Sequence, residues 1–175
     1  LLSLLGAAST ARAQNPRVML VGDSWAIQSS GLYNDMFASN GHPEITVVSS
    51  SEFGILARDV AQDPDGVPSL LRQSGNQEVE WLLISLGGND LLTDWTEHNA
   101  EGWVERLMEA YRDILNPIID ERPGLKIVMP GYDFMNFEMD PFCVALGYNT
   151  FHGLLTPQIN AELLRISEAQ LRMAE

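Results

Sequence analysis

Residues 17–30 read RVMLVGDSWAIQSS, and this stretch decides the fold. Residues 17–21 form a short apolar run, which is typical of a buried strand. A helix is expected over residues 27–38, so the Gly-Asp-Ser between them has to turn the chain from strand to helix. A small acidic turn is ordinary there, but a plain turn does not need the bulky Trp25. The stretch therefore raises the question whether Ser24 only shapes a turn or acts as a nucleophile.

The same alternation continues along the chain. Apolar runs predict three further strands, at residues 45–49, 81–86 and 125–129. Apolar residues spaced three or four apart predict further helices at residues 103–119 and about 157–173. Strands that alternate with helices in this way indicate one α/β domain, in which a parallel sheet carries helices on both faces.

Prolines mark the expected irregularities in this pattern. Pro64 and Pro68 are expected to break any helix within residues 54–71, because proline has no N–H to donate. Pro117 is expected to kink or shorten the last turn of its helix for the same reason. Pro157, directly after the capping residue Thr156, suits the first position of the last helix.

Composition narrows the classes of partner. The 175 residues are 45% hydrophobic, as in globular proteins, and ten basic against twenty-four acidic residues give a formal charge of −14. Such a surface repels phosphate backbones and anionic lipids, so we expect no nucleic acid partner and no membrane-surface partner. A neutral or cationic small molecule fits this charge. The single cysteine, Cys143, excludes an intramolecular disulfide and is expected to be a small buried hydrophobe.

Residues 1–13 resemble part of a secretory signal. Residues 1–8 are mostly apolar, and Ala-Arg-Ala at 11–13 has the small-x-small pattern at which such signals are cut. The apolar stretch is too short to cross a bilayer, so no membrane insertion is expected. This interpretation predicts a mature protein that begins near Gln14, with one C-terminally incomplete domain over residues 17–175, and a secreted or periplasmic location.

Polar residues and glycines follow each predicted strand. These stretches are Gly22-Asp23-Ser24, SSSEFG at 49–54, Gly87-Gly88-Asn89-Asp90 and PGYDFMNF at 130–137. Each alone is an ordinary turn. Because the carboxyl ends of parallel strands meet at one edge of a sheet, together they place a hydroxyl, backbone amides and a side-chain amide at one site. A serine that attacks an ester creates an oxyanion, and the Ser24 amide, the Gly54 amide and the Asn89 side chain are candidate donors to it.

These residues resemble a known family. VGDSW at 21–25, a glycine after the second strand and GGND at 87–90 are similar to blocks I, II and III of the SGNH (GDSL) hydrolases, secreted bacterial-type esterases and lipases. The resemblance implies a three-layer α/β/α sandwich with a flavodoxin-like parallel sheet. It implies Ser24 as the nucleophile and Ser24, Gly54 and Asn89 as the oxyanion hole. It further implies that carboxylic esters are hydrolysed through an acyl-serine, without a metal or cofactor.

The chain departs from the family pattern in two ways. Trp25 stands where the family usually has leucine; it either walls the substrate pocket or packs the first helix, and packing is the favoured interpretation. The family's Asp-x-x-His motif is absent, since none of His42, His98 and His152 follows an aspartate by three residues. We expect a fifth strand and this motif beyond Glu175, so that the fragment alone is a poor catalyst.

Residues 131–155 form a long predicted loop rich in aromatics. A loop of this length is usually functional, and a substrate lid and a locally packed loop are equally good interpretations. On the first interpretation Tyr132 and Phe134 join Trp25 as predicted substrate-binding residues. A calcium site at Asp133, Glu138 and Asp140 has no EF-hand spacing to support it, so no metal site is predicted.

Other classes of protein remain as alternatives. Gly22-x-Ser24-x-Ala26 approximates the nucleophile elbow of the α/β-hydrolases, but that elbow lies after several strands and not after the first. A flavodoxin-type binding module is disfavoured by Asp23, Trp25 and the acidic total. The stronger alternatives are a degenerate SGNH domain that binds carbohydrate without catalysis, and an O-acyltransferase. The sequence does not identify the acyl group or the alcohol.

Overall fold

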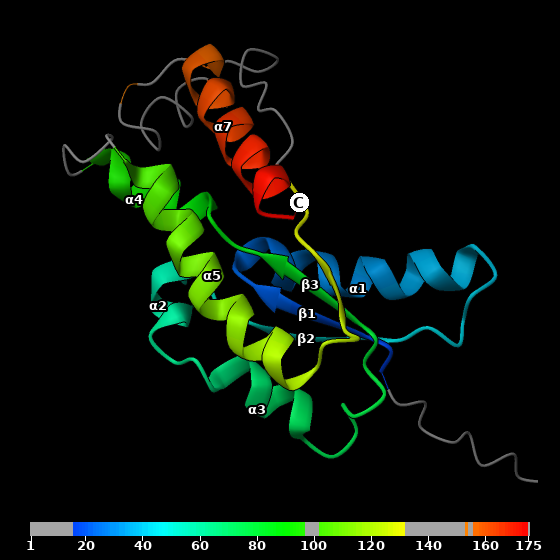
Figure 1. Ribbon diagram of the computed structural model, residues 1–175. Coiled ribbons are helices and arrows are strands. Elements are labelled where there is room, and N and C mark those ends of the chain that lie inside the picture. Colours follow the sequence, from blue (N-terminus) through cyan, green and yellow to red (C-terminus); the bar gives the residue numbers. More distant parts are fainter. Residues whose placement is uncertain (1–15, 97–101, 132–152, 154–155, 175) are drawn as a thin grey trace, which may run out of the picture.

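A computed structural model of the chain describes residues 16–96, 102–131, 153 and 156–174 (Figure 1). The described residues contain a four-stranded sheet in the order β2-β1-β3-β4, with every neighbouring pair parallel. The strands are β1 (Val18–Gly22), β2 (Val47–Ser51), β3 (Trp81–Ser85) and β4 (Lys126–Val128). The predicted α/β fold with a parallel sheet is therefore confirmed, and its strand order is that of flavodoxin-like sheets.

Helices lie on both faces of this sheet (Figure 1). The described helices are α1 (Ser24–Ser39), α2 (Ala57–Ala61), α3 (Gly66–Arg72), α4 (Gly88–Thr96), α5 (Trp103–Glu121) and α7 (Thr156–Ala174). Met19 and Val21 belong to the buried cluster that includes α5, whereas Val18 and Leu20 are buried outside that cluster. Because alternate strand residues point to opposite faces, β1 is buried between α5 on one side and α1 on the other.

Pro68 does not break its helix and Pro117 does not shorten its own, whereas a kink at Pro117 stays a prediction. Pro68 is the third residue of α3, where its missing N–H has no intrahelical acceptor in any case, so the helix is not broken there. α5 continues through Pro117 to Glu121 and is not shortened. Burial of Ile118 in the core and the hydrogen bond from Arg122 N to Ile118 O (2.8 Å) stabilise this last turn. Only Pro64, between α2 and α3, separates helices as predicted.

Two helices begin where the sequence analysis placed turns. α1 starts at Ser24, three residues earlier than expected, and α4 starts at Gly88 within the GGND stretch. Asn89, the candidate oxyanion donor in that stretch, thus lies in the first turn of a helix. None of the described helices is long and apolar enough to cross a bilayer.

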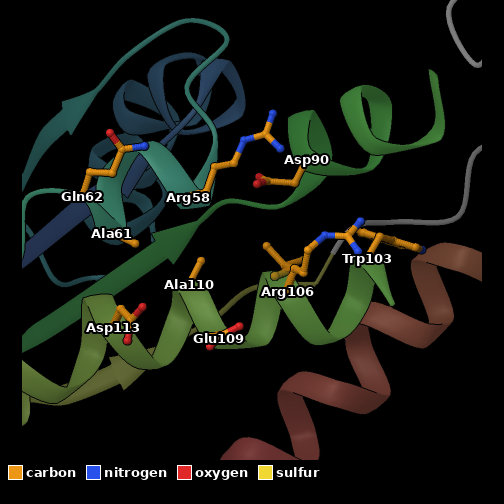
Figure 2. A pocket seen from close by; sticks show the side chains of 10 residues that line it. Arg58, Ala61, Gln62, Asp90, Trp103, Arg106, Glu109, Ala110 and Asp113 are labelled. Atoms are coloured by element: carbon orange, nitrogen blue, oxygen red, sulfur yellow. The ribbon is translucent and has the colours of Figure 1, made fainter. Parts of the chain in front are cut away.

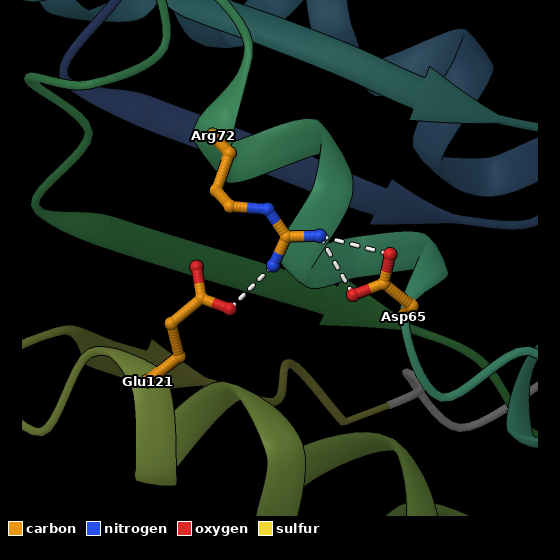
Figure 3. A network of polar contacts seen from close by, with 3 residues as sticks. All are labelled: Asp65, Arg72 and Glu121. Carbon is orange, nitrogen blue, oxygen red and sulfur yellow. Dashed lines mark hydrogen bonds and ion pairs between the residues drawn. The ribbon is translucent and has the colours of Figure 1, made fainter.

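A charged network fastens α3 to α5 (Figure 3). Arg72 Nη2 donates to both carboxylate oxygens of Asp65, at 2.6 and 2.8 Å, and Arg72 Nη1 donates to Glu121. The hydrogen bonds with Asp65 raise the pKa of the Arg72 guanidinium, which therefore stays charged. Because all three groups are solvent-exposed, the network orients the two helices more than it stabilises the fold.

The carboxyl end of β1 is the tightest point of the sheet. Gly22 pairs with Ser51 of β2 on one side and with Ser85 of β3 on the other. A Cβ at Gly22 would lie 2.2 Å from Ser85 O and 3.0 Å from Ala26 Cβ. Only glycine therefore allows the first turn of α1 to approach β3 this closely.

We expect Gly22→Ala to lower the free energy of unfolding by about 1–3 kcal/mol, because the added methyl group forces β1 and β3 apart. Gly31→Ala is the matched control, since a Cβ there meets nothing within 4 Å and the residue lies inside α1. That variant should gain about 0.5–1 kcal/mol. Urea unfolding of both proteins measures the difference, and a Gly22→Ala protein as stable as the wild type would contradict the close approach.

Candidate active site

Three turns meet at the carboxyl edge of the sheet. They follow β1, β2 and β3, whose last residues Gly22, Ser51 and Ser85 are register partners. Asp23 N donates to Ser85 O at 3.1 Å, and Glu52 N donates to Gly22 O at 3.0 Å. The backbone itself therefore joins the turn that carries Ser24 to the ends of both neighbouring strands.

Ser24 is held at the start of α1 by its neighbour. Asp23 is the N-cap and is 1% exposed, and its carboxylate accepts a hydrogen bond from Trp25 N at 3.0 Å. Ser24 itself is half-buried, and none of the described residues forms a hydrogen bond with its hydroxyl. Its backbone N–H lies in the first helical turn, where such groups have no intrahelical acceptor. Among the described residues, therefore, neither the hydroxyl nor the amide has a hydrogen-bond partner.

Trp25 does not pack the first helix. Its side chain is 60% exposed, so the favoured interpretation from the sequence was wrong. The reason is the position of the residue in the first turn: Ala26, the next residue, is the one that is fully buried against the sheet. An exposed indole directly beside Ser24 leaves substrate binding as the prediction for Trp25.

Asn89 contacts the segment that carries Gly54. Asn89 Nδ2 donates to Ile55 O at 3.1 Å, and Ile55 directly follows Gly54. A primary amide has two N–H donors, so one can fix the side chain while the second stays available to a ligand. Gly54 adopts a φ of +75°, is exposed, and has open space where a side chain would be. The turns after β2 and β3 are thereby brought into direct contact.

Two buried side chains beside these turns were not singled out from the sequence. Asp90 is 5% exposed, and its Oδ2 accepts a hydrogen bond from Ala57 N at 2.9 Å. Tyr111 of α5 is fully buried, and its hydroxyl donates to Leu86 O at 2.8 Å. The only sequence signal for Asp90 is its place next to Asn89, and Tyr111 carries no signal beyond the helical periodicity.

The Tyr111 hydroxyl belongs to a short buried network. It donates to Leu86 O and accepts from Gln170 Nε2 of α7 at 3.3 Å. Burial raises the pKa of the Tyr111 hydroxyl, so it remains a protonated donor at any physiological pH. Because Leu86 connects β3 to the Gly87–Asp90 stretch, the network links α5 and α7 to the base of the candidate site.

Two cavities flank the segment after β2. One, of about 390 Å³, is lined by Gly22, Ser51, Glu52 and Ile55 among others, and lies beside the turn of Ser24. The other, of about 310 Å³, lies between α2 and α5 (Figure 2). Its charged and polar lining consists of Arg58, Gln62, Asp90, Arg106, Glu109 and Asp113.

Several predicted residues lie outside the described part of the chain. These are the signal-like residues 1–13, the substrate-binding candidates Tyr132 and Phe134, the carboxylates at 133, 138 and 140, Cys143, and both His98 and His152. His42 is described and lies in the loop before β2, at the amino edge of the sheet and away from Ser24. Within the described residues, no three acidic, histidine or cysteine side chains are grouped to hold a metal ion.

Several solved structures are similar to this chain. A Bacteroides fragilis protein classed as an acylhydrolase matches 93% of this chain and 66% of its own, with a TM-score of 0.51 at 14% identity. An acetyl xylan esterase matches 83% of this chain and 71% of its own (TM-score 0.49, 13% identity). An α/β-hydrolase enzyme from the metagenome of Lake Arreo matches 81% and 72% (TM-score 0.47, 15% identity).

This chain thus spans about two thirds of the length of the acylhydrolase. No protein-family model matches the chain, and no curated protein matches it in sequence. At 14% identity the likeness to the acylhydrolase agrees with the α/β fold and shows nothing beyond the fold.

We expect Tyr111→Phe to destabilise the protein by about 1–3 kcal/mol, because it leaves Leu86 O and Gln170 Nε2 without a buried partner. Tyr33→Phe is the control, since Tyr33 lies on α1 and its hydroxyl bonds no described residue. That change should stay within about 0.5 kcal/mol. Thermal or urea unfolding measures both, and equal stabilities of the two variants would contradict the network.

Proposed function

We propose that this protein is an SGNH-type serine hydrolase that cleaves carboxylic esters through an acyl-serine intermediate. The observation that carries the proposal is the Ser24 hydroxyl. It opens a helix at the carboxyl edge of a parallel sheet and bonds none of the described residues, and Asn89 contacts the Gly54 segment at the same edge. The fold shared with an acylhydrolase agrees with this proposal.

In the proposed reaction, Ser24 Oγ bonds to the ester carbonyl carbon while a base takes its proton. The electron pair of the C=O bond moves to oxygen and forms an oxyanion. When the C=O bond re-forms, the alcohol leaves with the proton from the base. Water then repeats the sequence on the acyl-serine, releases the acid and restores the serine. These steps need no metal or cofactor.

Three N–H groups are proposed to stabilise the oxyanion. The Ser24 amide lies in the first turn of α1, and the Asn89 side chain has a second N–H besides the one that bonds Ile55 O. The third donor is the amide of Gly54, whose positive φ glycine permits. The buried Asp23 and Asp90 are the sequence neighbours of two of these donors, Ser24 and Asn89. Their carboxylates accept backbone N–H groups and so fix the turns on which the donors lie.

The general base is proposed to be the histidine of the family's Asp-x-x-His motif. His42 is the one histidine in the described part of the chain, and its place at the amino edge of the sheet excludes it from contact with Ser24. A base must come within hydrogen-bond reach of the nucleophile to act. The proposal therefore requires a histidine from outside the described residues.

The substrate is proposed to be a small ester of a neutral alcohol, such as a lipid, an acetylated sugar or another acyl ester. The exposed indole of Trp25 offers an aromatic surface beside the nucleophile, and the charge of −14 disfavours anionic esters. Tyr132 and Phe134 remain proposed substrate contacts. The signal-like residues 1–13 favour an exported enzyme. A carbohydrate-binding domain without catalysis and an O-acyltransferase are the alternatives.

Ser24→Ala should abolish covalent labelling by a fluorophosphonate probe and nearly all hydrolysis of p-nitrophenyl acetate by the full-length protein. The reason is that the acyl-serine cannot form without Oγ. Ser30→Ala on the same helix is the control, because the Ser30 hydroxyl only bonds Ile27 O at 3.0 Å. Labelling that persists in the Ser24 variant would refute the nucleophile. A wild type that is neither labelled nor active would favour the binding domain, and labelling without hydrolysis would favour the acyltransferase.

Asn89→Ala should lower kcat by about a hundredfold or more and leave KM within a few-fold, because the oxyanion exists only after attack. Circular dichroism and the unfolding midpoint show whether the variant keeps its fold. A folded Asn89→Ala enzyme with normal kcat would remove Asn89 from the oxyanion hole.

A further inference from the structure

Gly54 itself has no packing contacts. It is exposed, and no atom lies within 4 Å of the place where its Cβ would be. Its neighbour Ile55 packs against the core, but contacts of the glycine itself do not fix the orientation of its peptide groups. An oxyanion donor has to be held in place before the reaction to be effective. The question is what holds this one.

Hydrogen bonds anchor the segment on both sides of Gly54. On the amino side, Glu52 N donates to Gly22 O of β1 at 3.0 Å. On the carboxyl side, Ile55 O accepts from Asn89 Nδ2 at 3.1 Å, and Ala57 N donates to Asp90 Oδ2 at 2.9 Å. The first anchor is backbone and cannot be changed by a side chain. The other two depend on the consecutive residues Asn89 and Asp90.

These two side chains form what we term the Asn89–Asp90 clamp. One donates and the other accepts, and their partners lie on either side of Leu56. Of the two, the bond to Asp90 is buried and carries a charged acceptor, which makes it the stronger one. It also satisfies the first N–H of α2, whose N-cap Leu56 has no side-chain acceptor to offer.

We propose that Asp90 is a positioning residue of the oxyanion hole, which holds the Gly54 segment against Asn89 through its bond to Ala57 N. This inference rests on the proposed function. Asp90 touches neither substrate nor reacting atoms in this role. Its effect is to keep two donors, one from the turn after β2 and one from α4, at a fixed separation. A displacement of about 1 Å between such groups costs about a hundredfold in rate.

The test compares three variants of the full-length protein. Asp90→Ala removes the acceptor, and Asp90→Asn keeps an acceptor oxygen in the same place. Asp59→Ala is the matched control, because Asp59 Oδ2 accepts from the adjacent Leu56 N at 3.3 Å but is exposed. The readouts are kcat and KM for p-nitrophenyl acetate, and amide hydrogen exchange at Ala57.

We expect Asp90→Ala to lower kcat by about ten- to a hundredfold with KM within threefold, and to speed exchange of the Ala57 amide. Asp90→Asn should recover most of the kcat, and Asp59→Ala should stay within about twofold of the wild type. Because a partly unfolded sample also lowers the apparent kcat at unchanged KM, kcat is expressed per folded protein. Unfolding midpoints identify any variant that fails to fold.

Three results would overturn the positioning role: an unchanged kcat in folded Asp90→Ala, unchanged exchange at Ala57, or an Asp90→Asn enzyme as slow as Asp90→Ala. Should Asp90→Ala not fold, the Asp90→Asn and Asp59→Ala pair decides through Ala57 exchange, which must stay slow in both. A separate experiment tests the proposed function: hydrolysis that survives Ser24→Ala would refute it. A Ser24-dependent enzyme that is indifferent to Asp90→Ala overturns the positioning role alone.

Discussion

The close approach of β1 to β3 at Gly22 is the constraint on which the rest of the structure depends. It places Gly22 between Ser51 and Ser85 in one register and leaves no room for a side chain. Three parallel strands therefore end at the same level. Whatever follows each strand has to begin there, and this is why residues from three distant parts of the chain share one edge.

Buried acceptors hold the turns at this edge, together with the apolar packing of Ala26, Ile55 and Ala57. Asp23 caps α1, and Asp90 accepts the first N–H of α2, 33 residues away along the chain. Both carboxylates are at most 5% exposed, and each bonds at least one backbone N–H, as buried charges require. This acidic protein thus also has carboxylates in its interior, where they bind and orient backbone N–H groups.

Support from the helical layer reaches the same edge. α5 buries most of its inner face in the core, and Tyr111 extends a hydroxyl from that face to Leu86 O at the end of β3. Gln170 of α7 bonds the same hydroxyl, and Trp103 Nε1 of α5 donates to Glu162 of α7 at 2.9 Å. Hydrogen bonds thus connect α7, through Tyr111, to Leu86, the residue before the GGND stretch. The candidate site is therefore stabilised both by the Tyr111 network of the core and by the Asn89–Asp90 clamp.

Much of this architecture could be predicted from the sequence, because it follows from local pattern. Apolar runs located all four strands to within about two residues, and the Gly-Asp-Ser and GGND stretches pointed to the carboxyl edge. The predicted bounds of the helices were less accurate where a proline in the sequence is compensated by its position in the helix or by tertiary packing. Pro68 does not break α3, since it occupies the first turn, and Pro117 does not shorten α5, in which the buried Ile118 follows it.

By itself, then, the sequence determined the parallel α/β class, the level at which polar residues collect, and Ser24, Gly54 and Asn89 as candidates. Only the tertiary structure decided that Trp25 is exposed, that Asn89 bonds Ile55 O, and that Asp90 bonds Ala57 N. The physical reason is range. Periodicity and turn chemistry act over a few residues, whereas the contacts that orient a site join residues more than thirty positions apart, and these exist only once the sheet has set their register.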